Sequence, residues 1–202
     1  IKLKHSGGNG VIIAAPSSNP ASDRTITLPS DADGTLARTL DVGFKSYAVI
    51  ADGKVDNSDG GSFTAGAWRT RDLNHEITDE DNIVSISSNQ FTLAAGNYLI
   101  LATTPAIQVK GHQARIYNVT DSAVVAKGMA EFTGAISNGP GNLSRAAGRV
   151  SITGSKVFEI QHRCAFTTTG AYAMGTANLG GIDWNSGANG VFYTYCEIYK
   201  EP

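Results

Sequence analysis

Residues 156–164 read Lys-Val-Phe-Glu-Ile-Gln-His-Arg-Cys, and this stretch decides the fold class. Side chains in a β-strand point alternately to the two faces of the sheet. The alternation places on one face Phe158, Ile160, His162 and Cys164, and on the other Glu159, Gln161 and Arg163. The stretch therefore predicts a strand with one face in a core.

The same period of two recurs along most of the chain. In residues 191–200 this alternation predicts a strand with Phe192, Thr194, Cys196 and Ile198 on one face and Val191, Tyr193, Tyr195, Glu197 and Tyr199 on the other. Further strands are predicted at residues 45–51, 68–73, 83–87, 97–104, 112–119, 123–132 and 147–153. The turn signals between strands are Asp52-Gly53, Asp59-Gly60-Gly61, Ala95-Gly96-Asn97, Lys110-Gly111, Asn138-Gly139-Pro140-Gly141 and Gly180-Gly181.

Helical periodicity is weak throughout the sequence. No stretch sustains an apolar i, i+3, i+4, i+7 pattern over three turns, and residues 78–82 predict a single acidic turn at most. Many short strands separated by Gly-rich turns predict an all-β fold, a jelly-roll β-sandwich.

Composition excludes several classes of function. Of 202 residues, 17% are charged, below the roughly 25% of an ordinary soluble domain, and 23 are Gly. A formal net charge of -2 supplies no basic field for nucleic acid, and the longest apolar runs are far shorter than a membrane-spanning helix. The 2 Cys without CxxC spacing exclude a disulfide scaffold and a sulfur-rich zinc site. We therefore predict no nucleic-acid partner and no membrane insertion.

The first 43 residues differ in composition from the rest. They contain a short apolar run at residues 11–13, a Pro-, Ser- and Asn-rich stretch at residues 15–21, the segment Arg24-Thr-Ile-Thr-Leu-Pro29 and a turn cluster at residues 30–34. These 43 residues have too few apolar residues for a core of their own. We predict an N-terminal stem or linker over residues 1–43 and a jelly-roll head over residues 44–202. Because the sequence begins at Ile1, we expect it to be a piece of a longer chain.

One motif resembles a known family. Phe91-Thr-Leu-Ala-Ala-Gly96-Asn-Tyr98, followed by Leu99-Ile-Leu101, resembles the central signature of the complement-globular-head and tumour-necrosis-factor jelly rolls. In that pattern the aromatic residue closes one strand, Gly turns the chain and Tyr starts the next buried strand. The C-terminal sequence departs from the family, because it lacks the usual short Phe-x-Gly strand.

Together with the stem sequence at residues 24–34, the whole resembles the distal part of a tailed-bacteriophage tail fibre or tail spike. The resemblance implies an extracellular, virion-borne homotrimer that attaches to a bacterial surface glycan or outer-membrane protein and joins other virion proteins through its N-terminal side. It places Tyr98 near the subunit axis. Neutral aromatic strand faces are better buried than exposed, so the predicted trimer interface is Tyr98, Tyr193, Tyr195 and Tyr199.

Three alternatives remain open at this point. A capsid-decoration or head-fibre protein would use the same trimer. A carbohydrate-binding module of a secreted bacterial enzyme would be a monomer. A glycan-cleaving spike would need paired carboxylates in a groove.

Catalytic, metal-binding and cofactor residues are not predicted. The acidic residues fall mainly in turns, where Asp bonds its own backbone, at Asp31, Asp33, Asp52, Asp56, Asp59 and Asp79–Asp81. The loop at residues 52–61 lacks the calcium-loop spacing and reads as a solvated hairpin. His162 and Cys164 share an inward face, which favours core residues over a zinc pair, and in a reducing cytosol Cys164 and Cys196 are expected to be free thiols.

A long loop at residues 167–189 is the predicted ligand-binding element. Loops of this length in a compact domain are often functional. Aromatic rings can stack on sugars while amides and carboxylates bond hydroxyls, so the predicted binding residues are Tyr172, Asn178, Asp183, Trp184 and Asn185. The alternative is a structural role, in which Trp184 fills the core or the trimer interface. In residues 68–73, Arg69 or Arg71 is either an interface partner for a carboxylate or ordinary surface charge.

Overall fold

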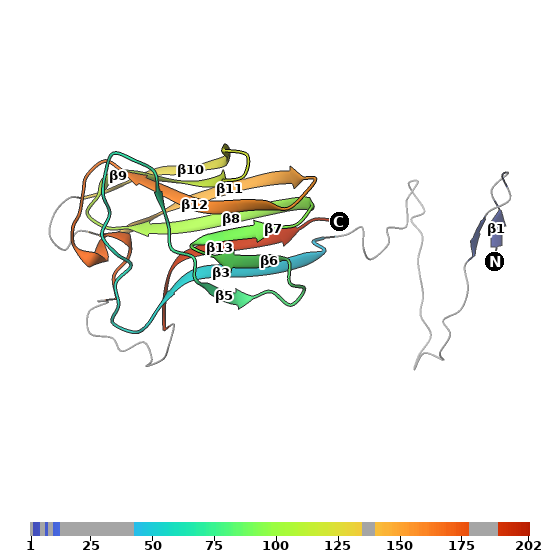
Figure 1. Ribbon diagram of the computed structural model, residues 1–202, viewed down its shortest axis with the longest axis horizontal. Helices are drawn as coiled ribbons and strands as arrows, with labels where there is room; N and C mark the ends of the chain where they lie inside the picture. The colour runs from blue at the N-terminus through green and yellow to red at the C-terminus, as the bar shows by residue number, and fades with distance from the viewer. Residues whose placement is uncertain (1, 5–6, 8–9, 13–42, 135–139, 178–189) are drawn as a thin grey trace, which may run out of the picture. The chain divides into compact units, whose positions relative to one another are not determined.

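A computed structural model describes residues 2–4, 7, 10–12, 43–134, 140–177 and 190–202 (Figure 1). The chain forms two compact units, Ile1–Ala37 and Arg38–Pro202. In the first unit, strand β1 (Lys2–Lys4) pairs antiparallel with β2 (Gly10–Ile12). The stem sequence at residues 24–34 lies outside the described residues, and the predicted stem stays a prediction.

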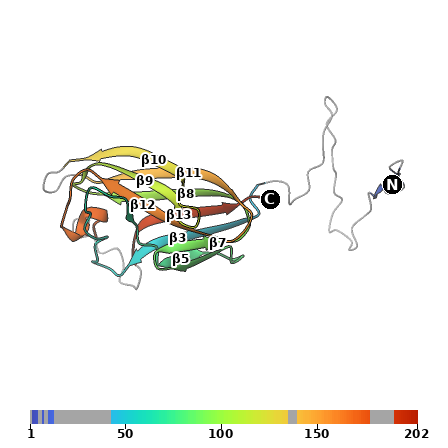
Figure 2. The same cartoon turned by 45° about the horizontal axis from the view of Figure 1, so that its top comes forward.

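The second unit is a sandwich of two antiparallel sheets (Figures 1 and 2). Five strands form one sheet, in the order β11 (Asn142–Ile152), β8 (Gly96–Ala106), β13 (Val191–Lys200), β3 (Ser46–Lys54) and β5 (His75–Thr78). The first and last long strands of the unit, β3 and β13, lie side by side. The Lys45 amide donates to the Lys200 carbonyl at 2.7 Å, so the chain enters and leaves this unit at the same end.

The opposite sheet contains six strands. Its main path runs β10 (Ala123–Thr133), β9 (Lys110–Asn118), β12 (Lys156–Cys164), β7 (Gln90–Leu93) and β6 (Val84–Ser87). The short strand β4 (Arg69–Thr70) pairs with the C-terminal half of β12. The two sheets and their strand order confirm the predicted all-β jelly-roll sandwich.

The predicted alternation explains the core between the sheets. Phe158 and Ile160 of β12 are fully buried, as are Ile100 of β8 and Ile198 of β13. Phe91 and Phe158 stack with their ring centroids 5.6 Å apart. A smaller apolar cluster closes one end of the sandwich and comprises Phe63, Ala106, Val109, Cys164 and Ala173. Burial of this apolar surface is the main stabilising contribution to the fold.

The family-like motif forms the β7–β8 connection. Gly96 opens β8 with a φ of +156°, and a Cβ atom there would lie 3.1 Å from the Tyr98 ring. Tyr98 is 1% exposed, and its hydroxyl donates to the Ala94 carbonyl at 3.1 Å. The glycine is therefore needed for close approach of the backbone to a core ring.

Several sequence predictions are wrong in detail. The predicted turn at Asp52-Gly53 is strand, because β3 continues to Lys54. Of the predicted strand at residues 68–73, only Arg69–Thr70 pairs as strand. Strand β5 was not predicted, and β11 begins at Asn142 rather than at Ala147. β5 is short and has Glu76 and Ile77 both exposed, and the first half of β11 has the polar Ser144 at a buried position, so neither segment shows the apolar alternation that predicts strands.

A β-bulge in β13 changes which tyrosines face outward. Phe192 lies opposite Gly53 and Tyr195 opposite Ala51, so Tyr193 and Thr194 together face one residue of β3. The extra residue turns both side chains inward, and Tyr193 is only 7% exposed. The strict alternation predicted for residues 191–200 therefore holds from Tyr195 onward but not at Tyr193.

Candidate functional site

The described part of the long loop packs on the end of the sandwich. Phe63 and Thr168 form an isolated antiparallel bridge, and a short 3-10 turn, η2 (Ala171–Met174), follows. The Tyr172 hydroxyl donates to Gln108 Oε1 at 2.9 Å. Of the predicted ligand-binding residues, Tyr172 is thus tied to the loop before β9, whereas Asn178, Asp183, Trp184 and Asn185 lie outside the described residues.

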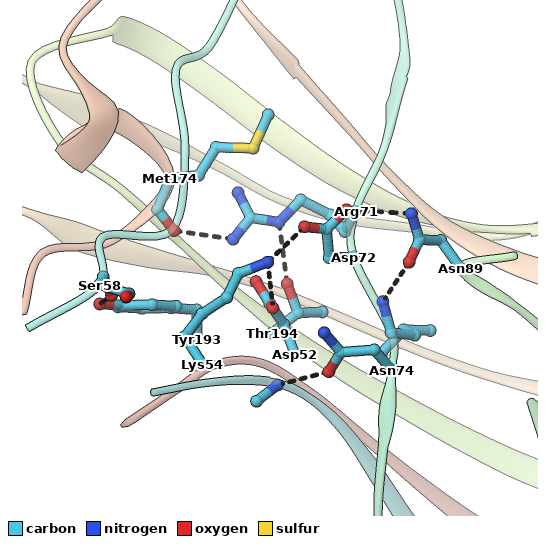
Figure 3. A network of polar contacts seen from close by, with 12 residues as sticks. Asp52, Lys54, Ser58, Arg71, Asp72, Asn74, Asn89, Met174, Tyr193 and Thr194 are labelled. Carbon is cyan, nitrogen blue, oxygen red and sulfur yellow. Dashed lines mark hydrogen bonds and ion pairs between the residues drawn. The ribbon is translucent and has the colours of Figure 1, made fainter. Parts of the chain in front are cut away.

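A buried arginine anchors this loop (Figure 3). Arg71 is 0% exposed, and its guanidinium donates from Nε to Thr194 Oγ1 and from Nη2 to the Met174 carbonyl, each at 2.8 Å. Burial lowers the Arg71 pKa to about 10. Arg71 therefore neither faces solvent nor serves as an interface partner: it links the loop to the core strands of one protomer.

Acidic side chains complete the network beside Arg71 (Figure 3). The Lys54 ammonium lies 3.1 Å from Asp52 Oδ1 and 2.6 Å from Asp72 Oδ2. Burial raises the Asp52 pKa, and the charge of Lys54 opposes that rise. Asn89 donates to Asp72 Oδ1 at 3.0 Å. The ion pair with Lys54 offsets the cost of burying Asp52, and the hydrogen bonds to Thr194 Oγ1 and the Met174 carbonyl offset the cost of burying Arg71.

Two further described turn acids have structural partners. Asp79 accepts from the backbone amides of Ile83 at 2.8 Å and Val84 at 2.9 Å. Asp59 accepts from the Ala177 amide at 2.8 Å. Asp31 and Asp33 lie outside the described residues. Within the described part of the chain, no group of three or more His, Cys, Asp and Glu side chains could hold a metal ion.

A histidine pair lies between β12 and the neighbouring strand β9. His162 is fully buried, and its Nε2 lies 2.9 Å from His112 Nδ1. His112 Nε2 in turn lies 2.5 Å from Asn142 Oδ1. Burial, helped by the Arg71 charge, lowers the His162 pKa well below its ordinary value. Cys164 and Cys196 are both buried free thiols. His162 is thus a core residue partnered by a histidine that the sequence did not single out.

The four predicted interface tyrosines fall into two groups. Tyr98 and Tyr193 lie inside the protomer, where the Tyr193 hydroxyl donates to the Ser58 carbonyl at 2.6 Å. Tyr195 and Tyr199 are partly exposed on the outer face of the five-stranded sheet. Burial within the protomer leaves Tyr98 and Tyr193 little surface for a partner, so an interface on this sheet would use Tyr195 and Tyr199.

An aromatic and aliphatic surface surrounds Tyr199. Phe44 is 49% exposed and Tyr47 is 40% exposed, and their ring centroids lie 4.4 Å and 4.8 Å from that of Tyr199. Leu99 and Leu101 of β8 lie opposite Tyr199 and Glu197 of β13. We call the set Phe44, Tyr47, Leu99, Leu101, Tyr195 and Tyr199 the aromatic face. This face spans the neighbouring strands β8, β13 and β3 and includes Phe44, two residues before β3.

A groove lies on the outer side of the six-stranded sheet. It measures about 660 Å³ and is lined by Gly66, Trp68, Gly111, His112, Gln113, Arg115, Lys127, Ala130, Glu131, Arg163, Cys164 and Ala165. The Arg115 guanidinium lies between two aromatic rings, 4.2 Å from the Trp68 centroid and 4.7 Å from that of Tyr117. The sequence analysis did not identify this site. Its one local signal was the alternation at residues 113–117, which places Gln113, Arg115 and Tyr117 on the same face of β9.

Comparison with known proteins concerns the fold alone. No protein-family model and no curated protein matches the sequence. Among solved structures, the chain is similar to murine APRIL, with a TM-score of 0.45 and 9% identity over 77% of this chain and 98% of that one. It is also similar to the globular domain of zebrafish complement 1qA, with a TM-score of 0.43 and 10% identity over 77% of this chain and 94% of that one. A third similar structure is the PRD1 vertex protein P5, with a TM-score of 0.44 and 14% identity over 80% of this chain and 100% of that one.

The sheet order defines the class of fold as an antiparallel jelly-roll β-sandwich. No helix in the described residues has the length and apolar character needed to cross a membrane.

Proposed function

We propose that this chain is a non-enzymatic structural and receptor-binding domain of a bacteriophage tail fibre or spike, acting as a homotrimer exposed on the virion. The head unit would attach to a bacterial surface glycan or outer-membrane protein. The N-terminal side would join other virion proteins. The motif at residues 91–98 and the stem sequence at residues 24–34 supply the resemblance behind the virion context and the number of subunits.

The aromatic face is the observation that carries the assembly proposal. Large aromatic side chains such as Phe44 and Tyr47 are strongly exposed there and lie within contact of Tyr199. A contiguous exposed apolar surface on a soluble protein commonly marks an interface with another protein. Aromatic residues are enriched at the centre of such interfaces. A second and third copy of this chain would remove the face from water.

The remaining surfaces support attachment rather than catalysis. Two of the described acids have structural roles: Asp52 is buried beside Lys54, and Asp79 accepts from two backbone amides. The described part of the loop packs at the end of the sandwich, where Arg71 and Gln108 anchor it. A rigid scaffold that presents loops at one end is the usual arrangement of a binding domain.

Sedimentation velocity at micromolar concentration tests the assembly. We expect a species three times the 21.1 kDa mass of the chain. Leu101→Glu places a second carboxylate opposite Glu197 on the aromatic face and should give a folded monomer. Val124→Glu is the matched control, because Val124 is 41% exposed on β10 of the other sheet. It should remain trimeric. A wild-type monomer would refute the assembly proposal.

Attachment is tested with fluorescently labelled protein on a panel of bacterial strains that differ in surface polysaccharide. We expect strain-dependent adhesion of wild type and Val124→Glu and much weaker adhesion of Leu101→Glu, because a trimer engages several sites at once. Circular dichroism should show the same β-sheet signal for all three proteins. Binding to no strain, together with binding to purified phage heads or tails only, would contradict the attachment role.

A further inference from the structure

The groove on the six-stranded sheet gathers side chains from four separate segments. Trp68 precedes β4, Arg115 lies on β9, Lys127 lies on β10 and Arg163 lies on β12. Its volume of about 660 Å³ falls within the roughly 300–1,000 Å³ range of small-ligand sites. Strand pairing alone brings these segments together, since Arg115 lies opposite Lys127 on one side and opposite Gln161 on the other.

Arg115 is held in a fixed orientation within the groove. Its Nε donates to Gln161 Oε1 at 2.6 Å, and Gln161 in turn donates to Glu159. The guanidinium also lies within cation–π distance of two rings, 4.2 Å from the Trp68 centroid and 4.7 Å from the Tyr117 centroid. Among the described residues, the two terminal amino groups of Arg115 have no hydrogen-bond acceptor, so they remain for a ligand. A stacked, oriented guanidinium is suited to bidentate recognition of an oxyanion.

The cations of the groove exceed its carboxylates. Its lining contains three basic residues, Arg115, Lys127 and Arg163, against one acidic residue, Glu131. Lys127 lies directly opposite Arg115, and like charges in that position destabilise a sheet. Within the described part of the chain, neither Lys127 nor Arg163 forms an ion pair. Folding therefore leaves a local excess of positive charge on a chain whose net charge is -2.

We propose that this groove binds an anionic group on a saccharide, with Arg115 as the bidentate anchor and Lys127 and Arg163 as supporting charges. The proposal rests on the proposed attachment function and specifies its ligand class as acidic surface polysaccharide. Trp68, which is partly exposed, supplies an apolar ring beside the anchor. A carboxylate of a uronic acid and a phosphate on a sugar offer the same oxyanion chemistry to the guanidinium.

Calorimetric titration of the full chain with defined sugars tests the ligand class. The probes are a glucuronic-acid-containing tetrasaccharide, its carboxyl-reduced neutral counterpart and a sugar phosphate. We expect the neutral counterpart to bind about tenfold more weakly or worse than the uronate. Binding should also weaken as salt rises, since the groove is open to solvent. Comparison of the uronate with the sugar phosphate identifies the source of the anion.

Variants locate the binding to the groove. Arg115→Gln should weaken binding of the acidic probe about tenfold or more. Arg115→Lys should weaken it less, because lysine keeps the positive charge but cannot donate the two parallel hydrogen bonds of a guanidinium. Lys156→Gln is the matched control: it removes one positive charge from β12 at the end away from Arg163. Circular dichroism and thermal unfolding establish that each variant is folded.

The outcomes separate this inference from the proposed function. Equal binding of acidic and neutral sugars, or undiminished binding by folded Arg115→Gln, would overturn the groove proposal. If the trimer adheres to cells and Arg115→Gln adheres equally well, the attachment role stands and the groove assignment fails. If Arg115-dependent binding of acidic sugar occurs without trimer or cell adhesion, the groove assignment stands and the proposed function fails.

Discussion

Replacement of Arg71 by methionine is expected to destabilise the head unit strongly. Methionine keeps the apolar stem of the side chain and removes the guanidinium. The two short hydrogen bonds to Thr194 Oγ1 and the Met174 carbonyl, each 2.8 Å, are lost. Because Arg71 is fully buried, water does not replace the missing donors. The nearby carboxylate of Asp52 also loses a favourable charge.

The size of the effect follows from these contacts. A hydrogen bond from a charged donor contributes about 1.5–3 kcal/mol. Two of them give about 3–6 kcal/mol, and we expect a loss of about 3–5 kcal/mol, the cost of removing one partner from a buried ionic network. For a chain of this size, such a loss lowers the unfolding midpoint by roughly 6–20 °C.

Urea unfolding followed by circular dichroism, at one fixed protein concentration, measures the change. Arg69→Met is the matched control, because exposed Arg69 makes only a 3.4 Å bond to the Thr64 carbonyl. Its effect should stay below about 0.5 kcal/mol. Amide hydrogen exchange in residues 171–177 should rise in Arg71→Met and not in Arg69→Met. A loss below about 1 kcal/mol in Arg71→Met would show that the buried guanidinium does not stabilise the fold.

Three further predictions concern pH and backbone geometry. Because the folded state lowers the pKa of His162, it binds fewer protons than the unfolded state below about pH 6.5. Stability should therefore fall as the pH drops from 7.5 to 5, and His162→Gln should show a shallower fall in its urea midpoint. Gly175→Ala should destabilise the head by about 1–3 kcal/mol in urea unfolding, since φ is +134° and a Cβ would overlap the Tyr193 ring. The hydrogen bond to Glu197 raises the pKa of Tyr199 to about 12. Glu197→Gln should bring that pKa closer to its ordinary value in an absorbance titration against a Tyr199→Phe reference, and an unchanged value would contradict the assignment.

Local sequence was sufficient for the fold class. Alternation in residues 156–164 follows from the geometry of an extended backbone, and it correctly placed Phe158 and Ile160 in the core. The turn at Gly96 could also be predicted locally, because the ring of Tyr98, two residues later, leaves little room for a Cβ atom at this position. Where the alternation is interrupted, local prediction failed: the bulge in β13 moved Tyr193 inward and left Tyr195 outside.

The β-sandwich follows from local sequence, because successive side chains of an extended backbone point to opposite faces of the sheet. The tertiary structure determines which charged side chains are buried and which side chains from different strands lie in contact. Arg69 and Arg71 have the same local pattern, yet one is exposed and the other lies under the loop that contains Met174. Trp68 reaches Arg115 because β4 and β9 pair with the same strand, β12. Such contacts depend on the order of strands in the sheet, which alternation along a single strand does not encode.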